Sequence, residues 1–331
     1  MTTKHILSSS IALLTLALPA FAASAPKKTE TKPADDKSAL TFANGMLTLD
    51  LEERLRWEVR DNTRDFNRAT NDVRDDGWVL NRFRLGIAFR PSPWVKIYAQ
   101  TQDTREWFGQ RGNVPGVNGV EGGDYFDLRQ AYIELGNLKE FPLSLTVGRQ
   151  ALDYGDNRLV ADSKWGNFGR TFDGVKLRLQ TDKFWVDTFA VRPVQIRKNS
   201  VNDSDSADNF FGIYAGSDFL GFQTTELYFL YRDKADNQPD LDPTNKLNPD
   251  GTYTGPAQRI VTLGTRWKSK AGALHGWDYT AEFAYQFGQL WTGDRTTKRL
   301  NHHAFAAAIK GGYTWENAPW TPRLGIEYDY A

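Results

Sequence analysis

The sequence predicts an all-β fold, a transmembrane antiparallel β-barrel, and three features of the chain support this prediction. Apolar and polar side chains alternate with a period of two along most of the chain, which places each kind on its own face of a strand. The predicted strands are about ten residues long, which suits a tilted crossing of a bilayer. Long and short connections alternate between them, as in outer-membrane barrels, where the long loops lie outside and the short turns face the periplasm.

Composition excludes several other classes of protein. The chain has 331 residues, and its 41 Lys and Arg balance its 41 Asp and Glu, so the bulk charge does not favour nucleic acid. Beyond the N-terminus there is no run of about 18 apolar residues, which excludes a helical membrane protein. The absence of Cys excludes disulfide frameworks, thiol nucleophiles and Cys-ligated zinc. An aromatic content of 13% indicates a folded chain rather than a disordered one.

The N-terminus reads as an export signal. Lys4 and His5 precede an apolar stretch over residues 6–18, and Ala20-Phe21-Ala22 supplies the small residues of a cleavage site. We therefore predict a signal peptide over residues 1–22, because the apolar stretch is too short for a membrane-spanning helix. Residues 23–41 mix Lys, Asp, Thr and Pro without an apolar period, which predicts a flexible periplasmic leader. The barrel is expected over residues 42–331, in the outer membrane of a Gram-negative bacterium.

Thirteen strands follow from the alternating pattern, which begins with leucines, a tryptophan and a valine set against Thr, Asp, Glu and Arg. The predicted strands are 47–60, 79–90, 94–105, 127–135, 143–150, 171–181, 184–193, 209–217, 224–233, 259–268, 278–288, 302–314 and 323–331. The long connections, expected outside the cell, are 61–78, 106–126, 151–170, 194–208, 234–258 and 289–301. Tryptophans recur near the strand ends, as in the aromatic girdle of a barrel. A soluble β-sandwich is the alternative, but its strands are shorter and nothing in it requires loop lengths to alternate.

The strand count is odd. The first strand precedes a long loop and so runs outward, and by alternation the thirteenth also runs outward. Bacterial single-chain barrels have an even number of strands with both termini in the periplasm. We therefore expect this chain to be the N-terminal part of a longer barrel, with a miscounted strand as the alternative.

If the apolar face of each strand contacts lipid, the opposite face lines the lumen and carries more bases than acids. The candidate pore-lining residues on this face are Arg54, Arg56, Arg82, Arg84, Lys176, Arg178, Arg266, Glu134 and Glu282. Arg and Lys in a lumen favour anions, and the planar guanidinium group binds carboxylates in a bidentate manner. The alternative is that these charges pair across neighbouring strands and simply fill the barrel.

Several blocks resemble the alginate export family of outer-membrane barrels: LRQAYIEL (128–135), VGRQALDYGDNRLV (147–160) and KWGNFGRTFDGVKL (164–177). The resemblance implies an 18-stranded monomeric barrel that passively conducts an anionic polyuronate through an Arg-rich constriction. It also implies pore positions for Arg129 and Arg149. Arg149 shares its face with Leu145 and Val147, so a lumen position for Arg149 requires a bulge or a strand end at Gly148.

The sequence lacks the catalytic motifs that would indicate an enzyme. Only His275, His302 and His303 follow the signal peptide, and no G-x-S-x-G motif accompanies a serine, so no enzymatic activity is expected. The acid-rich stretches 203–208 and 236–250 are candidates for Ca²⁺ but lack the spacing of a calcium loop, so no cofactor is expected.

The sequence thus predicts a passive outer-membrane channel for a hydrophilic, anionic solute, with export of an alginate-like polysaccharide as its most specific form. The expected partners are outer-membrane lipid, an anionic oligo- or polysaccharide and a periplasmic export component. A general or nutrient-uptake porin is the first alternative, and a secreted polysaccharide-binding β-protein is the second.

Overall fold

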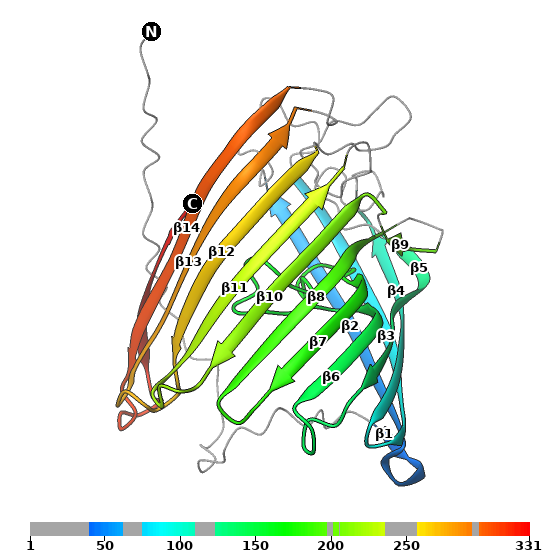
Figure 1. Ribbon diagram of the computed structural model, residues 1–331, viewed down its shortest axis with the longest axis horizontal. Helices are drawn as coiled ribbons and strands as arrows, with labels where there is room; N and C mark the ends of the chain where they lie inside the picture. Colours follow the sequence, from blue (N-terminus) through cyan, green and yellow to red (C-terminus); the bar gives the residue numbers. More distant parts are fainter. Residues whose placement is uncertain are drawn as a thin grey trace.

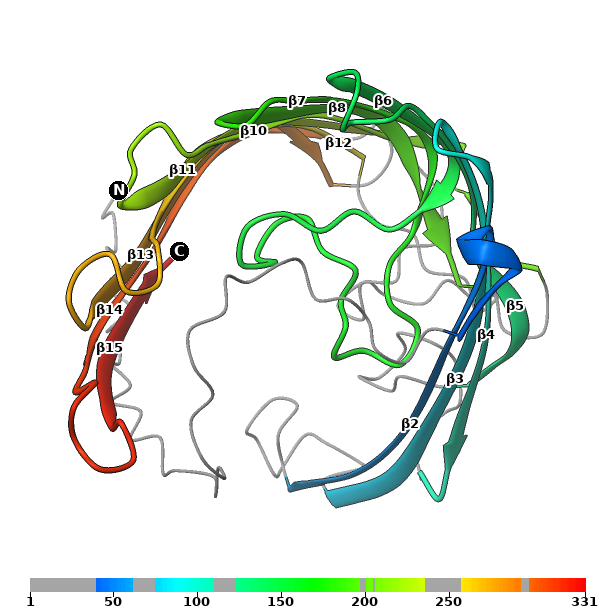
Figure 2. The ribbon, with the colours of Figure 1, turned by 90° about the horizontal axis from the view of Figure 1, so that it is seen from below.

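The computed structural model describes residues 40–61, 75–109, 123–196, 201–204, 206–235, 257–292 and 298–331. These residues form a 15-stranded antiparallel sheet that curves around a lumen (Figures 1 and 2). Thirteen of its strands are long, and each corresponds to one of the thirteen predicted strands. They are β2 (Leu47–Asp61), β3 (Asp75–Ser92), β4 (Val95–Trp107), β5 (Asp124–Leu135), β6 (Leu143–Gln150), β7 (Phe172–Gln180), β8 (Phe184–Gln195), β10 (Asp208–Ser217), β11 (Gln223–Lys234), β12 (Gln258–Ser269), β13 (Trp277–Trp291), β14 (Arg299–Thr314) and β15 (Arg323–Tyr330). The all-β prediction is confirmed.

Two short strands complete the sheet. β1 (Leu40–Phe42) pairs with the start of β2, and β9 (Asp203–Ser204) pairs with the end of β8. The long strands pair with their neighbours in sequence, so the described sheet is an open path from β1 to β15. Further strands beyond this chain stay a prediction. The predicted signal peptide and nearly all of the predicted leader lie outside the described residues.

The outer face of the sheet is mostly apolar. Along β2 the exposed side chains are those of the odd-numbered residues, and they include Leu55, Trp57 and Val59. The same alternation continues through Ile87 and Phe89 of β3. This face is the surface that the sequence assigns to lipid. None of the helices in the described part of the chain has the length and apolarity needed to span a bilayer.

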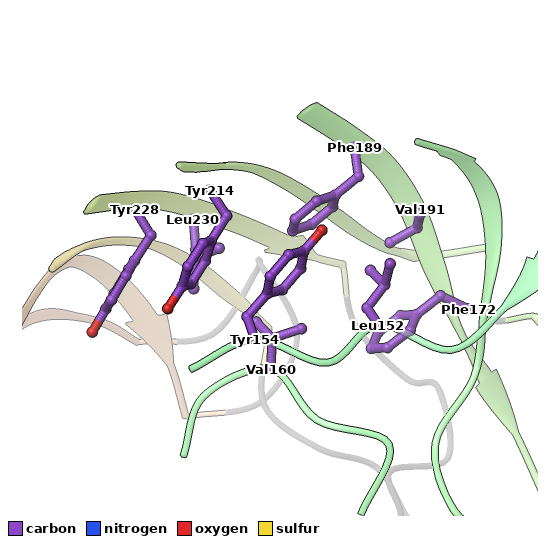
Figure 3. Packing of buried hydrophobic residues seen from close by; sticks show 9 residues of the cluster. All are labelled: Leu152, Tyr154, Val160, Phe172, Phe189, Val191, Tyr214, Tyr228 and Leu230. Carbon is purple, nitrogen blue, oxygen red and sulfur yellow. The ribbon is translucent and has the colours of Figure 1, made fainter. Parts of the chain in front are cut away.

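The inner face carries a cluster of buried apolar side chains (Figure 3). It joins the segment after β6 to the inner wall of β7, β8, β10 and β11, and its members are Leu152, Tyr154, Val160, Phe172, Phe189, Val191, Tyr214, Tyr228 and Leu230. The rings need glycine beside them: a Cβ at Gly212 would overlap the ring of Phe189, and one at Gly264 would overlap the ring of Tyr228. Glycine therefore lets the rings lie flat on the neighbouring strand.

Candidate functional site

A loop inside the barrel, residues 151–171, is the central feature of the lumen. This lumen loop leaves the end of β6, folds inward and returns to the start of β7 (Figure 2). Sequence analysis had placed residues 151–170 among the outer loops, so this prediction was wrong. The physical reason is that three apolar side chains of the loop are buried against the wall, and that its carbonyl oxygens find arginine donors there.

The lumen loop consists of two turns. The first turn, residues 154–160, is closed by a hydrogen bond from the Tyr154 N–H to the Val160 carbonyl oxygen at 3.1 Å. The second turn, residues 162–170, is closed by the Arg170 N–H, which donates to the Asp162 carbonyl oxygen at 2.6 Å. Gly155 (φ 59°), in the first turn, has the left-handed backbone conformation that glycine adopts without strain.

The first turn is held by apolar packing. Leu152, which precedes it, is 1% exposed, and Val160 is 3% exposed. The Tyr154 ring stacks on Tyr214 of β10, with centroids 4.4 Å apart and planes 13° apart. Its hydroxyl donates to the buried Asp187 carboxylate of β8 at 2.7 Å. Burial and the neighbouring Asp187 raise the pKa of Tyr154 well above its ordinary value, so the phenol stays a neutral donor.

Charged groups fix the tip of the first turn. Asp156 lies 3.0 Å from Lys310 of β14 and also pairs with Arg266 of β12. Burial opposes ionisation of this carboxyl group, but Lys310 and Arg266 outweigh it and lower the pKa of Asp156 to about 2. Arg158 reaches Glu282 of β13 at 3.2 Å and Glu327 of β15 at 3.1 Å. The tip is thus tied to four strands on one side of the lumen.

The second turn lies against a row of arginines on β2 and β3. Arg54 donates to the carbonyl oxygens of residues 164–166 at 2.9–3.1 Å. Arg56 donates to the Trp165 carbonyl oxygen and stacks on its ring, 4.5 Å from the centroid. Arg82 donates to the Gly166 carbonyl oxygen at 2.9 Å and Arg84 to that of Phe168 at 3.1 Å. Successive backbone carbonyls therefore accept from successive guanidinium groups.

Arg129 joins this row from β5 because of a bulge. In the pairing of β4 with β5, Gln100 is opposite Gln130 and Thr101 is opposite Leu128, so Arg129 has no partner in the register. Such a bulge redirects a side chain. Arg129 contacts the Asp162 carboxylate of the lumen loop and donates to the Gln100 side-chain oxygen at 2.6 Å. The structure therefore places Arg129 in the lumen. We call Arg54, Arg82, Arg84 and Arg129 the arginine row.

Carboxylates are shared within the row. Glu52 pairs with both Arg82 and Arg84, and Asp162 pairs with Arg129. Three guanidinium groups thus share two carboxylates, which leaves donors available to acceptors such as the carbonyls of the second turn.

Other predicted residues sit in wall ion pairs. Arg178 binds Asp187 through two hydrogen bonds of 2.6 and 2.8 Å, and Arg266 donates to Glu226 at 2.9 Å. Glu282 accepts from the Tyr228 hydroxyl at 3.1 Å, besides pairing with the first turn. The lumen contains more acids than sequence analysis had placed there, because Asp187 and Glu226 and the aspartates of the lumen loop were not among its predicted inward groups.

Lys176 and Glu134 lie away from the lumen loop. In register, Thr146 of β6 stands between Glu134 on β5 and Lys176 on β7, and all three face inward. Lys96 approaches Glu134 at 3.8 Å and donates to the Tyr132 hydroxyl at 2.9 Å. These residues line the wall without touching the arginine row.

The structure corrects the predicted pore position of Arg149. It forms two hydrogen bonds of 2.8 and 2.9 Å with Asp173, its register partner on β7. Both side chains share the outward face with Val147 and Val175, while the next pair along, Gln150 and Phe172, is buried inside. The strand end does not turn Arg149 into the lumen, so the pore position inferred from family resemblance is wrong for this residue.

The family model for alginate export matches residues 46–331. The chain belongs to the alginate export family. This membership makes it an outer-membrane β-barrel channel, and the predicted family is confirmed. No curated protein matches the sequence.

Several solved barrels are similar to this member of the family. OccAB4 of Acinetobacter baumannii is 12% identical, with 86% of this chain and 97% of that chain covered at a TM-score of 0.38. OccAB3 of the same species is 12% identical, with 86% and 81% covered at a TM-score of 0.45. OprB of Pseudomonas putida is 12% identical, with 86% and 93% covered at a TM-score of 0.42.

Proposed function

We propose that this protein conducts a hydrophilic, anionic solute passively across the outer membrane, and that an anionic polysaccharide of the alginate type is its substrate. The observation that carries the proposal is the arginine row. Arg54, Arg82, Arg84 and Arg129 come from β2, β3 and β5 and converge on one side of the lumen, where the lumen loop narrows the passage. Arg82 and Arg84 are only 4% exposed and Arg129 is 7% exposed, so a solute that passes this side reaches their guanidinium donors in competition with the second turn.

The chemistry of these groups suits carboxylates. A guanidinium group offers parallel N–H donors that match the two oxygens of a carboxylate, and the bond is charge-assisted on both sides. Conduction also requires that each binding step be weak and repeated. The carbonyl oxygens and the shared Glu52 already compete for the donors of the row, so no single carboxylate of a solute is held tightly.

A general or nutrient-uptake porin is the second candidate, and a specific observation favours it. Away from the arginine row, arginines of the wall are paired with acids, as in Arg178 with Asp187 and Arg266 with Glu226. A lumen that is balanced in this way conducts small solutes of either sign. The two functions differ in whether a polyuronate blocks the current. The outward apolar face and the family membership speak against the secreted, soluble alternative.

A bilayer experiment tests the proposal. We would reconstitute the protein in a planar bilayer under a salt gradient, record the reversal potential, and then add polygalacturonate to one side. We expect anion preference and a block that grows with polyuronate concentration. The double variant Arg82→Glu, Arg84→Glu should lose both, whereas the outward Arg149→Glu should keep both. A wild-type reversal potential in the double variant would refute the role of the arginine row.

The proposal extends to the setting of the channel. We propose that the protein is exported by a signal peptide over residues 1–22, is monomeric, and receives its solute from a periplasmic export component. No cofactor and no catalytic step belong to this proposal. Recovery of the protein in the detergent-soluble fraction of outer membranes, with an N-terminus after Ala22, would support it.

A further inference from the structure

We propose that the second turn of the lumen loop, residues 162–170, is a built-in occupant of the arginine row that an anionic solute displaces, while the first turn stays in place. This inference rests on the proposed function, since it concerns how the same anion site is regulated. Three observations carry it: what the second turn offers to the arginines, how differently the two turns are anchored, and where the second turn is pinned.

The second turn presents to the arginines what an acidic solute would present. Seven hydrogen bonds run from guanidinium groups to its backbone carbonyl oxygens, and the Asp162 carboxylate occupies Arg129. A carbonyl oxygen is a neutral acceptor, whereas a solute carboxylate forms shorter and stronger bonds with the same donors. Exchange of carbonyls for carboxylates therefore leaves the guanidinium groups better satisfied than before.

The two turns are anchored by different forces. The first turn buries apolar groups, and their removal from the wall would expose that surface to water. In the second turn no apolar side chain is buried: Trp165 is 70% exposed and Phe168 is half-buried. Its one fully buried side chain is Asn167, whose amide donates to the carbonyl oxygens of Asn81 and Arg105 at 3.2 and 3.5 Å. Water or a solute can replace such polar contacts at small net cost.

The second turn is also pinned so that it moves as one unit. Asp162 closes its neck, because its carboxylate accepts from the Arg170 N–H at 3.2 Å as well as from Arg129. On either side of the neck the chain is fixed: Val160 is buried in the apolar cluster, and the Thr171 carbonyl oxygen accepts from the Val194 N–H of β8 at 3.0 Å. The segment between these fixed points is held by polar contacts, which include the pair of Lys164 with Asp153 at 2.8 Å, and by the stacking of Arg56 on the exposed Trp165 ring. Among the described residues, Asp162 is the one that ties both the neck and Arg129, so its loss loosens the segment most.

The absence of Cys from the chain allows a site-directed label to test this inference. We would place a nitroxide at Lys164→Cys in the second turn and, as a matched control, at Leu159→Cys in the first turn; both side chains point away from the buried cluster. Oligogalacturonate is the probe, and a neutral malto-oligosaccharide is the control solute. We expect oligogalacturonate to raise the mobile fraction of the label at position 164 at least twofold, with no change at position 159 and no effect of the neutral sugar.

Two variants sharpen the test. Asp162→Asn removes one charge-assisted contact and should lower the concentration for half-maximal mobilisation about tenfold. Asn167→Ala removes the buried amide and should act in the same direction, which keeps the inference testable if Asp162→Asn does not fold. Current block by oligogalacturonate without a change at position 164 would overturn the displacement and leave the proposed function standing. Movement of both labels would also overturn it, because the loop would then move as a whole. Absence of both block and mobilisation would overturn the proposed function and, with it, this inference.

Discussion

Tyr154 is the residue whose removal should release the lumen loop. Its ring lies between the wall and the first turn, is 8% exposed, and stacks on Tyr214. Truncation of a buried aromatic side chain to Ala costs about 3–5 kcal/mol. Tyr154→Phe keeps the ring and loses only the hydrogen bond to Asp187, which retains two hydrogen bonds from Arg178. That single bond is worth about 1 kcal/mol.

These magnitudes translate into opening of the loop. A loss of about 3 kcal/mol raises the population of the open loop by about two orders of magnitude, whereas 1 kcal/mol raises it about fivefold. Trypsin reports this population, because Arg158 lies in the first turn and is tied to Glu282 while the loop is closed. When closing is faster than cleavage, the rate of cutting follows the open fraction. We therefore expect cleavage after Arg158 to accelerate about 100-fold in Tyr154→Ala and only about fivefold in Tyr154→Phe.

The control is Tyr285→Ala, which removes an equally large ring from the outward face of β13, where it is 46% exposed. This variant should be cut at the wild-type rate. Each variant would first be checked for the heat-modifiable gel band of a folded barrel. If Tyr154→Ala is folded and cut no faster than Tyr154→Phe, apolar packing does not hold the first turn and the reasoning fails.

Three further outcomes are expected. Arg149→Glu should leave the reversal potential unchanged, because Arg149 faces outward and pairs with Asp173; a shift measured in bilayers would return Arg149 to the lumen. The pKa of Asp156 is lowered to about 2 from 3.8, so its contacts stabilise the first turn fully above pH of about 4 and weaken as the pH falls through about 2. Current noise from loop motion should therefore be independent of pH between 4 and 8 and rise at pH 2.5, and Asp156→Asn should show the raised noise at every pH. Gly264→Val should displace the Tyr228 ring and destabilise the barrel by about 1–3 kcal/mol, seen as a lower temperature for the band shift on gels.

The strands follow from local alternation, and their predicted positions are therefore close to those observed. The prediction 143–150 coincides with β6 (Leu143–Gln150). β3 starts earlier than predicted, at Asp75 instead of residue 79, because backbone pairing with β2 continues to Asp61 beyond the end of the apolar alternation. Apolar patterning reports the part of a strand that lies in the membrane, and hydrogen bonding carries the strand further.

The inward position of the lumen loop could not be predicted from the sequence, because the contacts of the loop are non-local and its hydrogen-bond acceptors are backbone atoms. Arg54 and the Gly166 carbonyl oxygen are 112 residues apart, and any residue at position 166 would supply the same oxygen. The bulge that turns Arg129 inward likewise leaves no signal in the alternation. For Arg149 the alternation was the better guide: it indicated an outward side chain, and the structure agrees against the family resemblance.

In the mechanism that we propose, selectivity depends on where charges lie rather than on how many there are. The arginine row occupies β2, β3 and β5, whereas the ties of the first turn lie on β8 and β12–β15. The lumen loop separates these two sides. On the second side Asp156 and Arg158 are matched by partners and fixed by apolar packing beside them, so a solute gains little by binding there. On the first side, by the displacement that we propose, the neutral carbonyls yield to carboxylates, and only a solute that carries them gains free energy by displacing the turn. Such a lumen can be close to neutral in total charge and still favour anions, because only one of its two walls has exchangeable donors.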